Sequence, residues 1–476
     1  MSHRHAAAAR PPRTTPTRLA AVAAAVVAVA FTAVLLATLR DAPALERPEQ
    51  EAAAAPVSHT VLGCPPGRGD AALKVASAGG LREPTPSGGT ADVSLEQPPA
   101  EDRTLGLGRG SLVVTGVDAA DLVLTAEGDA AQGLLALRAE RSGSTLAAAG
   151  CPAPRPVWWF AGAGGGVDHS SQLFLTNTDE GPAVVDVRLH GATGSVDRAG
   201  TRGITLAPGK TVRLPLAEIA PGSDELTVEV VATRGRVVAH VLDTVRLGDG
   251  VGREWLPPAG PPGEDVVLTA VPSGAARDVL LVTNPGEDQA LVDLELLTVD
   301  GAFVPLGTEQ VSVDPDTVVR VDVTEALKGR AAAVHLSAET PVTGAVRATS
   351  AGSDDVAYAG AATALTGPVG LTVAGESTEV LVAGGEKAGT GELILFAADG
   401  EQVSRQGYTA PPSGLVRIPL PAQVAYAVLL PRAGDGYAAA VHTTPGAAVQ
   451  PATPLPTTVL RPVVLPFTGE SADTGG

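Results

Sequence analysis

The chain has 476 residues, enough for three or four domains of ordinary size, and it is 44% hydrophobic but only 3% aromatic. Its 56 glycines and 40 prolines are typical of many short strands joined by tight turns rather than of long helices. The formal net charge of −19 argues against nucleic-acid binding, because an acidic body repels phosphate backbones.

The first apolar segment, residues 19–39, reads LAAVAAAVVAVAFTAVLLATL and carries no charged side chain. A helix of this length spans about 30 Å, the thickness of the hydrocarbon core of a membrane. Four arginines lie in residues 1–18, so the positive-inside rule predicts a cytoplasmic N-terminus and an extracytoplasmic body. The alternative is a signal peptide whose cleavage releases a secreted protein, but a usual signal sequence has an apolar run of only about 7–15 residues. We therefore predict an uncleaved transmembrane anchor, followed by a stalk over residues 40–56.

The only two cysteines, Cys64 and Cys151, lie in the part predicted to be outside the cytoplasm. An isolated pair in an oxidising compartment is most simply a disulfide. Two free thiols or half of a metal site are the alternatives, and neither has a supporting His or Cys nearby. The bond would close residues 57–154 into one module and stabilise it by on the order of 4 kcal/mol through chain entropy.

The body is built from a repeat. The run LFLTNTDEGPAVVDVRLHGATG from Leu173 aligns with LLVTNPGEDQALVDLELLTVDG from Leu280 at an offset of 107, and a more divergent copy begins at Glu379. Each copy closes with two apolar runs around a predicted turn, and a similar pair of runs from Leu122 predicts a divergent fourth module near the N-terminus. The predicted modules span residues 57–154, 155–262, 263–366 and 367–450, and the tail 451–476 is predicted to be disordered.

Within each copy, short runs rich in Val, Leu and Thr alternate apolar and polar residues. Val185, Val187 and Leu189 fall on one face of such a run, while Asp186 and Arg188 fall on the other. Asp-Gly pairs follow matching runs in two copies and indicate tight hairpins. The pattern predicts an all-β protein of tandem immunoglobulin-like antiparallel β-sandwiches behind one N-terminal transmembrane helix.

Three segments in succession carry a family resemblance: CPAP from Cys151, VWWFAG from Val157, and LFLTNTD from Leu173. Together they resemble an uncharacterised actinobacterial family of membrane-anchored or secreted proteins, built from a domain of unknown function with Trp-Trp-Phe-x-Gly β-sandwich repeats. The resemblance covers most of the chain from Cys64 to about Thr444 and is loose in the third copy. It implies the fold and an extracytoplasmic location, and it assigns no activity, ligand or catalytic residue.

Two segments hold residue types that are typical of catalytic sites. Gly162–Gly166 lacks the third glycine of a dinucleotide fingerprint, where Val167 stands, so a flexible connection between strands is predicted. Residues 168–171 (Asp-His-Ser-Ser) contain the groups of a hydrolase triad. Neighbouring side chains of an extended chain point to alternate faces and a triad converges from distant segments, so a polar loop is predicted here.

The sequence predicts no metal site and no cofactor. The histidines of the body are scattered one per strand or loop, without the spacing of zinc ligands. The acidic pairs Asp314/Asp316 and Asp354/Asp355 could hold calcium between modules, but no EF-hand spacing is present and solvated turns are favoured.

Trp158, Trp159 and Trp255 are the candidate ligand-binding or packing aromatics. Exposed indoles would form a stacking platform for sugars. Buried indoles would place one of the adjacent pair in a core and the other at an interface, and Trp255 would pack the two ends of its module together. Burial is the favoured interpretation.

The sequence LPFTG at residues 465–469 matches the pattern cut by sortases. Only a short acidic stretch follows it, without the apolar helix and basic stop that a sorting signal requires. The N-terminal helix is therefore the favoured attachment to the cell.

These features predict a non-catalytic extracytoplasmic envelope protein that acts as a structural, adhesion or protein-interaction scaffold. Its expected partners are envelope proteins or cell-wall glycans, and it contacts the membrane through its N-terminal helix. The alternative is a glycan-binding accessory protein in cell-envelope polysaccharide assembly. A hydrolase would need Ser, His and acidic groups that converge from separate strands, and no such set is predicted.

Overall fold

Strands with one apolar face make up most of the structure, a computed structural model. In β12 (Ala183–Gly191) the side chains of Val185, Val187 and Leu189 are buried, whereas Arg188 is exposed, as the alternation predicts. The protein is all-β, with several antiparallel sheets. The structure describes residues 53–67, 71–78, 90–96, 101–108, 110–116, 122–196, 198–351, 354–443, 446–456 and 458–461, and residues 55–459 form one compact unit.

The strands of this unit fall into four consecutive modules. Module 1 comprises β2 (His59–Cys64), β3 (Ala72–Ser77), β4 (Thr90–Glu96), β5 (Arg103–Gly108), β6 (Leu112–Gly116), β7 (Leu122–Glu127), the short helix η1 (Gly128–Ala131), β8 (Leu134–Ser142) and β9 (Thr145–Gly150). Module 2 comprises β10 (Val157–Ala163), β11 (His169–Thr176), β12, β13 (Gly194–Val196), β14 (Ile204–Leu206), β15 (Thr211–Pro215), α2 (Leu216–Ile219), β16 (Leu226–Arg234), β17 (Val238–Leu247) and β18 (Gly250–Trp255).

Module 3 comprises β19 (Gly263–Val271), β20 (Ala275–Asn284), β21 (Ala290–Thr298), β22 (Gly301–Phe303), β23 (Gln310–Val313), β24 (Thr317–Asp322), α3 (Thr324–Leu327), β25 (Ala332–Ser350) and β26 (Val356–Gly360). Module 4 comprises β27 (Val369–Thr372), β28 (Ser377–Gly384), β29 (Gly389–Phe396), β30 (Gln402–Ala410), β31 (Leu415–Pro419), β32 (Tyr426–Ala433), β33 (Gly436–Thr443), β34 (Ala447–Pro451) and β35 (Thr453–Pro454). A separate two-stranded sheet pairs β1 (Ala53–Pro56) with β36 (Thr458–Arg461).

All four modules share one strand order. In module 1 the two sheets run β2-β7-β4-β5 and β6-β3-β8-β9, and in module 2 the matching strands run β10-β16-β12-β14 and β15-β11-β17-β18. Module 4 repeats the order as β27-β32-β29-β30 and β31-β28-β33-β34. Numbered within a module, the sheets read 1-6-3-4 and 5-2-7-8. An immunoglobulin domain has the strand orders 1-2-5-4 and 3-6-7 in its two sheets. The modules resemble it in being all-β and of about the same length, but their strands are connected in a different order.

In module 3 the predicted turn between the two closing runs is absent. There β25 runs without interruption for 19 residues and pairs first with β19 and β21 and then with β20 and β26. In module 2 the same path is divided into β16 and β17 by a turn at Gly235, whose φ is +73°. One strand therefore serves both sheets of module 3.

Each module has an apolar core between its two sheets. In module 1 the core combines Leu62, Val93 and Leu124 of one sheet with Leu73 and Val75 of the other. The predicted disulfide is formed there, between the last residue of β2 and the residue that follows β9, and both cysteines are buried. It therefore joins the two ends of module 1.

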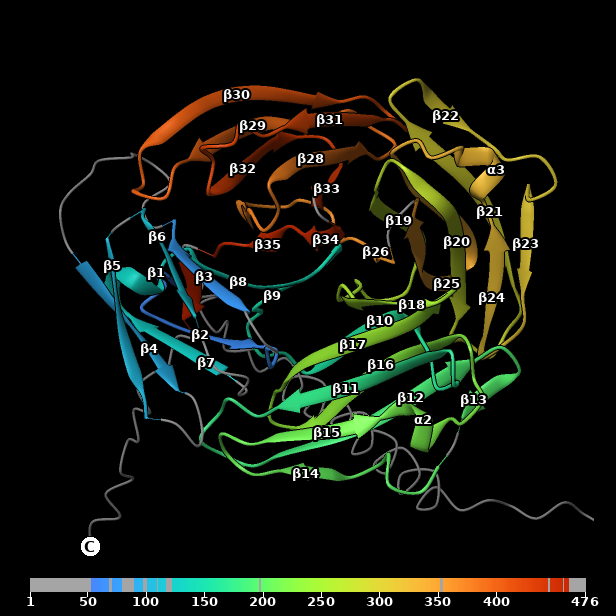
Figure 1. The fold of residues 1–476 in the computed structure, drawn as a ribbon, viewed down its shortest axis with the longest axis horizontal. Coiled ribbons are helices and arrows are strands. Elements are labelled where there is room, and N and C mark those ends of the chain that lie inside the picture. The colour runs from blue at the N-terminus through green and yellow to red at the C-terminus, as the bar shows by residue number, and fades with distance from the viewer. Residues whose placement is uncertain are drawn as a thin grey trace, which may run out of the picture. The chain divides into compact units, whose positions relative to one another are not determined.

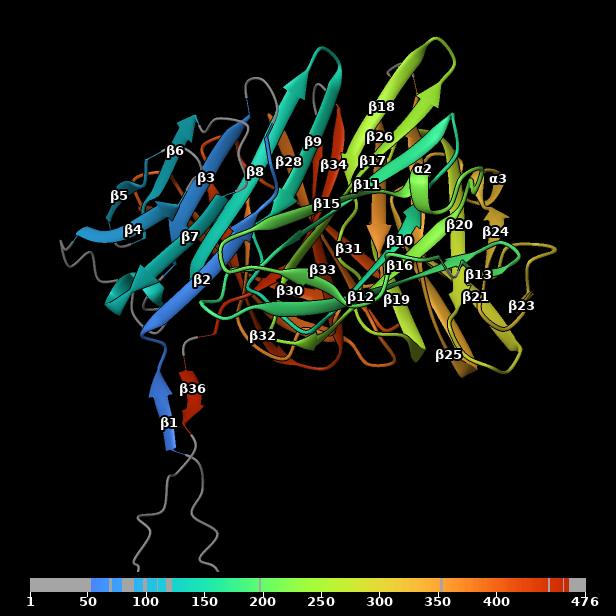
Figure 2. The ribbon, with the colours of Figure 1, turned by 90° about the horizontal axis from the view of Figure 1, so that it is seen from below.

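Further apolar clusters join the modules to one another. Modules 1 and 4 share a cluster around Leu135, Phe396 and Tyr426, and the Tyr426 hydroxyl donates to the carbonyl of Gly110 at 2.5 Å. Similar clusters join module 1 to module 2, module 2 to module 3 and module 3 to module 4, so the modules of the unit close into a ring, which Figure 1 shows face-on and Figure 2 edge-on. The last strand of each eight-strand pattern, β9, β18, β26 or β34, lies on the inner side of that ring.

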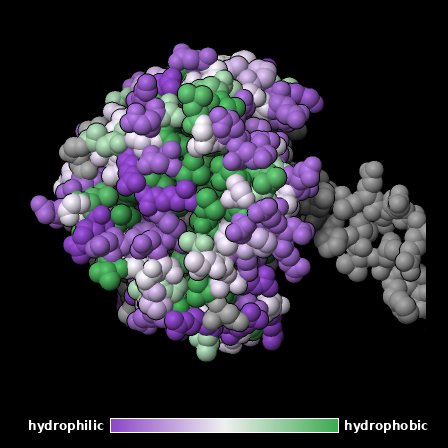
Figure 3. All heavy atoms as spheres, turned by 90° about the vertical axis from the view of Figure 1, so that its right-hand side faces the viewer, coloured by the Kyte–Doolittle hydropathy of each residue, from purple (hydrophilic) through white to green (hydrophobic). Residues whose placement is uncertain are grey.

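The face of the molecule seen in Figure 3 is mostly hydrophilic, with hydrophobic patches near its middle and toward its upper and left edges. The strongly exposed large hydrophobic residues of module 3 are Leu291, Val299, Val304 and Leu306.

The ends of the chain differ in part from expectation. The tail was predicted to begin at residue 451, yet β35 pairs with β27 and Leu455 is buried. Among the described residues, no helix has the length and apolar character needed to cross a membrane. The predicted anchor at 19–39, nearly all of the predicted stalk and the LPFTG sequence lie outside the described residues.

Candidate functional site

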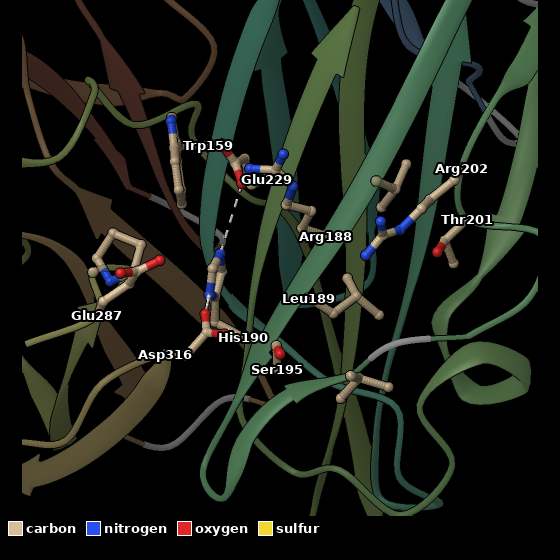
Figure 4. A pocket seen from close by; sticks show the side chains of 14 residues that line it. Trp159, Arg188, Leu189, His190, Ser195, Thr201, Arg202, Glu229, Glu287 and Asp316 are labelled. Carbon is tan, nitrogen blue, oxygen red and sulfur yellow. Dashed lines mark hydrogen bonds and ion pairs between the residues drawn. The ribbon is translucent and has the colours of Figure 1, made fainter.

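A groove of about 520 Å³ opens at the junction of modules 2 and 3. Its floor is formed by β12 and β16 of module 2, and one wall by two turns of module 3 (Figure 4). We call it the junction groove. Its lining residues are Trp159, Val187, Arg188, Leu189, His190, Ser195, Val196, Thr201, Arg202, Glu229, Pro285, Gly286, Glu287 and Asp316.

His190 occupies the middle of the junction groove and is held on two sides. Its Nδ1 lies 2.6 Å from Oδ1 of Asp316, and its ring stacks on Trp159 with centroids 5.7 Å apart. Only 3% of the residue is exposed. Its Nε2 has no hydrogen-bond partner among the described residues, and the carboxylate oxygen Oε2 of Glu229 stands 3.9 Å away, too far for a direct bond. A buried ring nitrogen therefore faces the groove unsatisfied.

Asp316 reaches His190 from a strained turn. Its φ is +61°, a conformation that favours glycine, although Asp tolerates it better than most residues. The equivalent residue of the preceding repeat, at the offset of 107, is Gly209, with φ +65°. Module 3 thus carries a carboxylate at a position where module 2 carries glycine, and that carboxylate binds module 2.

The charged side chains around His190 nearly balance. Arg188 and Glu229 face each other across β12 and β16, with Nη1 3.2 Å from Oε2. Arg202 adds a second cation, while Glu287 and Asp316 add two more anions. Two arginines against three acids, with one histidine, leave the groove close to neutral. The hydroxyls of the lining come from Ser195 and Thr201.

The triad-like residues 168–171 form a different structure from the predicted polar loop. His169 and Ser171 lie in β11 and point to the same face, where both bind Asp243: His169 Nε2 lies 3.1 Å from the carboxylate, and Ser171 donates its hydroxyl at 2.5 Å. Tyr358 of module 3 donates to the same carboxylate at 2.5 Å. Since Ser171 donates to Asp243 rather than to His169, the histidine does not activate the hydroxyl as a triad histidine would.

This buried network continues through an ion pair. Arg347 of module 3 binds both carboxylate oxygens of Glu225 of module 2, at 2.8 and 3.1 Å. Burial alone would lower the pKa of His169, but the adjacent Asp243 carboxylate outweighs it and raises that pKa. The Arg347–Glu225 pair and the Tyr358–Asp243 bond both run from module 3 to module 2. The cluster is therefore a structural lock between modules.

The predicted flexible glycine segment is tightly packed. Gly162 lies inside β10 with φ +100°, and a β-carbon there would come within 2.8 Å of the Tyr358 ring. Gly165 donates its amide to the carbonyl of Ser223, and a β-carbon on it would stand 2.2 Å from the carbonyl oxygen of Ala220. Close backbone approach, rather than mobility, is the reason for glycine here.

All three tryptophans are buried. Trp158 lies in the core of module 2 and donates its indole N–H to the carbonyl of Val237, while Trp159 packs into the core of module 3. One of the pair is thus in its own core and the other at an interface, as the alternation predicted. Trp255 differs from expectation, because it packs against Phe174 and against module 1 rather than joining the ends of its own module. Trp159 reaches the junction groove as support for His190, not as an open stacking platform.

The acidic pairs are used as hydrogen-bond acceptors. Asp314 accepts from the side chain of Gln289 and Asp316 binds His190, while Asp355 is fully buried at the centre of the ring. The prediction of a solvated turn is therefore wrong for Asp355. Within the part of the chain that the structure describes, no cluster of three or more His, Cys, Asp or Glu side chains is placed to hold a metal ion.

The sequence contained a signal for the groove that the prediction did not use. By strand pairing, Trp159 corresponds to Val267 in the next module, and by the repeat offset His190 corresponds to Leu297. Val267 and Leu297 are buried in the apolar cluster that joins module 3 to module 4. The same positions therefore close one junction with apolar contacts and line an open, polar groove at the other.

Fold and site together define a protein of four packed β-sandwich modules with a polar groove between two of them. The chain belongs to the family of unknown function DUF5719, whose sequence profile matches residues 110–421. That match begins in module 1 and ends in module 4, so the family describes the assembled modules rather than one repeat. No curated protein and no solved structure shows significant similarity to the chain.

Proposed function

We propose that this chain is a non-catalytic, membrane-anchored protein of the cell envelope whose four-module body serves as a rigid scaffold outside the cytoplasm. The observation that carries the proposal is the closure of the modules into one body. Modules on flexible linkers would move independently. In this body every module packs against two neighbours, so the outer surfaces of the modules stay at fixed positions relative to one another. Such an arrangement suits a protein that organises several partners.

Location is supported by two features of the sequence and structure. Residues 19–39 have the length and composition of a membrane-spanning helix, preceded by arginines that favour the cytoplasmic side. The body contains a disulfide between Cys64 and Cys151, and such bonds persist in oxidising compartments. Its partners would then be envelope proteins or cell-wall polymers.

The non-catalytic part of the proposal is supported by how the reactive side chains are used. Ser171, His169 and Asp243 are buried and bonded inside the body, where they lock two modules together. In the junction groove, His190 Nδ1 binds Asp316, and although Ser195 is the strand partner of His190, its hydroxyl makes no hydrogen bond to the open ring nitrogen; the Thr201 hydroxyl donates to the carbonyl of Arg198. This arrangement is suited to binding rather than to nucleophilic attack.

The location is tested by cysteine labelling in intact cells. Leu306 is 98% exposed, so a Leu306→Cys variant offers a reactive thiol on the body, and Ser2→Cys offers one before the apolar segment. A membrane-impermeant maleimide should label Leu306→Cys in intact cells and Ser2→Cys only after lysis. Labelling of Ser2→Cys first, or of neither before lysis, contradicts the proposed orientation.

Scaffolding is tested by photo-cross-linking in the same cells. A photoreactive residue at Leu306 in module 3 and another at Val114 in module 1, which is 56% exposed, sample two separate surfaces. A scaffold should give discrete adducts from both positions. Adducts of the chain with itself alone would argue against this function.

Glycan binding is a second candidate function. The junction groove favours it, because it combines hydroxyl, carboxylate and guanidinium groups with apolar side chains in a volume typical of small-molecule sites.

A further inference from the structure

We propose that the junction groove is a binding site for a neutral saccharide, one with neighbouring free hydroxyls. The inference rests on the proposed function, in that it assigns a ligand class to a non-catalytic envelope protein. It depends on three observations: an unsatisfied buried nitrogen, a nearly neutral mixed lining, and a comparison between two junctions of the same chain.

The unsatisfied nitrogen sets the geometry of the ligand. His190 Nε2 and Glu229 Oε2 are 3.9 Å apart, a separation that one inserted oxygen or two adjacent ones can bridge. Because Nδ1 binds the Asp316 carboxylate, Nδ1 carries a proton, and Nε2 is an acceptor when the ring is neutral and a donor when it is charged. A hydroxyl both donates and accepts, so neighbouring hydroxyls satisfy Glu229 and Nε2 in either state. An anionic group would satisfy neither Glu229 nor a neutral ring.

The charge of the lining selects against ionic ligands. The side chains of Arg188 and Arg202 are offset by those of Glu229, Glu287 and Asp316. A phosphate or uronate would meet three carboxylates, and an ammonium group would meet two guanidinium groups. A neutral polar molecule can form hydrogen bonds with the donors and acceptors of the lining and is not repelled by side chains of either charge. Val187, Val196 and Pro285 add apolar surface that suits the C–H faces of a sugar ring.

The comparison of junctions indicates that the polar groups of the groove are not required by the fold. Where modules 3 and 4 meet, the equivalents of Trp159 and His190 are Val267 and Leu297, and both are buried in an apolar cluster. At these positions the fold thus joins modules 3 and 4 through apolar contacts. At the junction of modules 2 and 3, the chain instead keeps a buried histidine with an open nitrogen and holds Asp316 in a strained backbone conformation to bind it. Features that cost stability locally, such as an unsatisfied buried nitrogen or a strained backbone, are typical of binding sites.

Trp159 is a positioning residue in this site. Its indole stacks on the His190 ring at an interplanar angle of 21° and is only 7% exposed, so it fixes the ring without offering its own face to the ligand. Ligand contacts are therefore assigned to His190, Glu229 and Arg188.

The test is calorimetric titration of the full chain in detergent with methyl glycosides and neutral disaccharides of glucose, galactose, mannose and arabinose. Matching disaccharides that contain a uronic acid or an amino sugar provide the charged comparison. We expect at least one neutral sugar to bind and its charged counterparts to bind more weakly. Failure of every neutral sugar to bind the folded protein overturns the assignment, as does tighter binding of the charged series.

Two variants and one control locate the binding. Glu229→Gln keeps the side-chain shape and removes a charged acceptor, and His190→Leu places in module 2 the residue that module 3 tolerates at this position. Each should weaken binding roughly tenfold or more, the effect of losing a hydrogen bond to a charged group. Glu392→Gln in module 4 removes a comparable strand carboxylate that pairs with Arg405 and Arg432, and it should leave the affinity unchanged. Unchanged affinity in both groove variants overturns the site.

The result separates this inference from the proposed function. If the sugars bind and are cleaved, which chromatography of the incubated mixture detects, the site stands and the non-catalytic function fails. If no sugar binds while the labelling and cross-linking results hold, the scaffold stands and the ligand assignment fails. Should His190→Leu not fold, as judged by its melting temperature, Glu229→Gln decides the outcome alone.

Discussion

The carboxylate of Asp355 accepts a hydrogen bond from the backbone amide of Ala447 at 2.6 Å, and this contact joins module 3 to module 4. The same oxygen accepts from the amide of Leu146 in module 1 at 3.3 Å. Nearby, Glu254 of module 2 accepts from the amide of Ala148, also in module 1. Two buried carboxyl groups therefore connect backbone segments from all four modules at the centre of the ring.

Asp355 makes the stability of the ring depend on pH. Burial raises its pKa from 3.8 to about 6, although its amide partners oppose the shift. The Asp355 carboxyl group therefore binds its proton more tightly in the folded chain than in the unfolded chain. As a result, the free energy of unfolding falls as pH rises from about 4 to about 6 and then levels off. Asp355→Asn keeps one acceptor oxygen and removes the titration.

The check is urea denaturation of both proteins at several pH values between about 4 and 7. The difference in unfolding free energy between wild type and Asp355→Asn should change by on the order of 2 kcal/mol across this window. Titrating groups that do not interact with Asp355, including Asp278, contribute to both proteins and cancel in the difference. Glu254 does not cancel fully, because burial and also the Asp355 charge raise its pKa. Parallel pH profiles would show that Asp355 does not titrate in the folded body.

Asp243 should be among the most sensitive positions of the junction between modules 2 and 3. It accepts from His169, Ser171 and Tyr358, so Asp243→Asn leaves buried donors with an amide in place of a charge. We expect a loss of about 2–5 kcal/mol in unfolding free energy. The exposed ion pair of Asp168 with Arg246 supplies the control, since Asp168→Asn should cost less than about 1 kcal/mol.

The same variant has a pH signature. With its raised pKa, His169 contributes stability that is full below its unfolded pKa of 6.5 and is lost as pH rises through the folded value. Asp243→Asn removes the main interactions that raise the pKa of His169, while Glu225 still raises it, so most of the pH dependence that comes from His169 should disappear. An unchanged profile in the neutral range would contradict the assigned pairing.

Gly162 should resist even a single added methyl group. Gly162→Ala forces a β-carbon against the Tyr358 ring in a backbone conformation with φ +100°. A loss of about 2 kcal/mol or more is expected from the combined strain and overlap. Gly181→Ala, where a β-carbon meets no atom within 4 Å, should lie within about 0.5 kcal/mol of wild type. Equal melting temperatures for the two variants would refute the close packing.

The disulfide should stabilise module 1 most strongly. Cys64 and Cys151 are 87 residues apart, and opening a loop of this length costs on the order of 4 kcal/mol through unfolded-state entropy. The double variant Cys64→Ser/Cys151→Ser should melt several degrees lower, and its module 1 peptides should exchange amide hydrogens faster than those of module 3. Uniform exchange across the modules would indicate that the ring, not the disulfide, holds module 1.

Local patterns in the sequence predicted many of the strands and hairpins, but they also predicted a turn in module 3 where β25 runs on without interruption. Asn177 and Asn284, paired by the repeat, each donate to one carbonyl of the turn that follows and accept one amide from it, and each also donates to a carbonyl 29 residues further along the chain. Such turns depend on residues close in the chain, which a repeat alignment brings out.

The junctions depend on residues far apart, and the prediction missed them. His190 and Asp316 are separated by 126 positions and meet only because module 3 packs on module 2. For residues 168–171, alternation along an extended chain was used to exclude convergence, yet His169 and Ser171 are two apart and therefore share a face. Their common partner, Asp243, lies 72 residues beyond Ser171 on an adjacent strand.

Amide hydrogen exchange at Leu146 and Ala447 in the full chain is the most direct test of the closed body. Both amides bind Asp355 across module boundaries, so in a closed ring they should exchange as slowly as the strand cores of modules 2 and 3. Exchange of these two amides within seconds, while the strand cores stay protected, would mean that the modules separate in solution and would contradict the rigid scaffold.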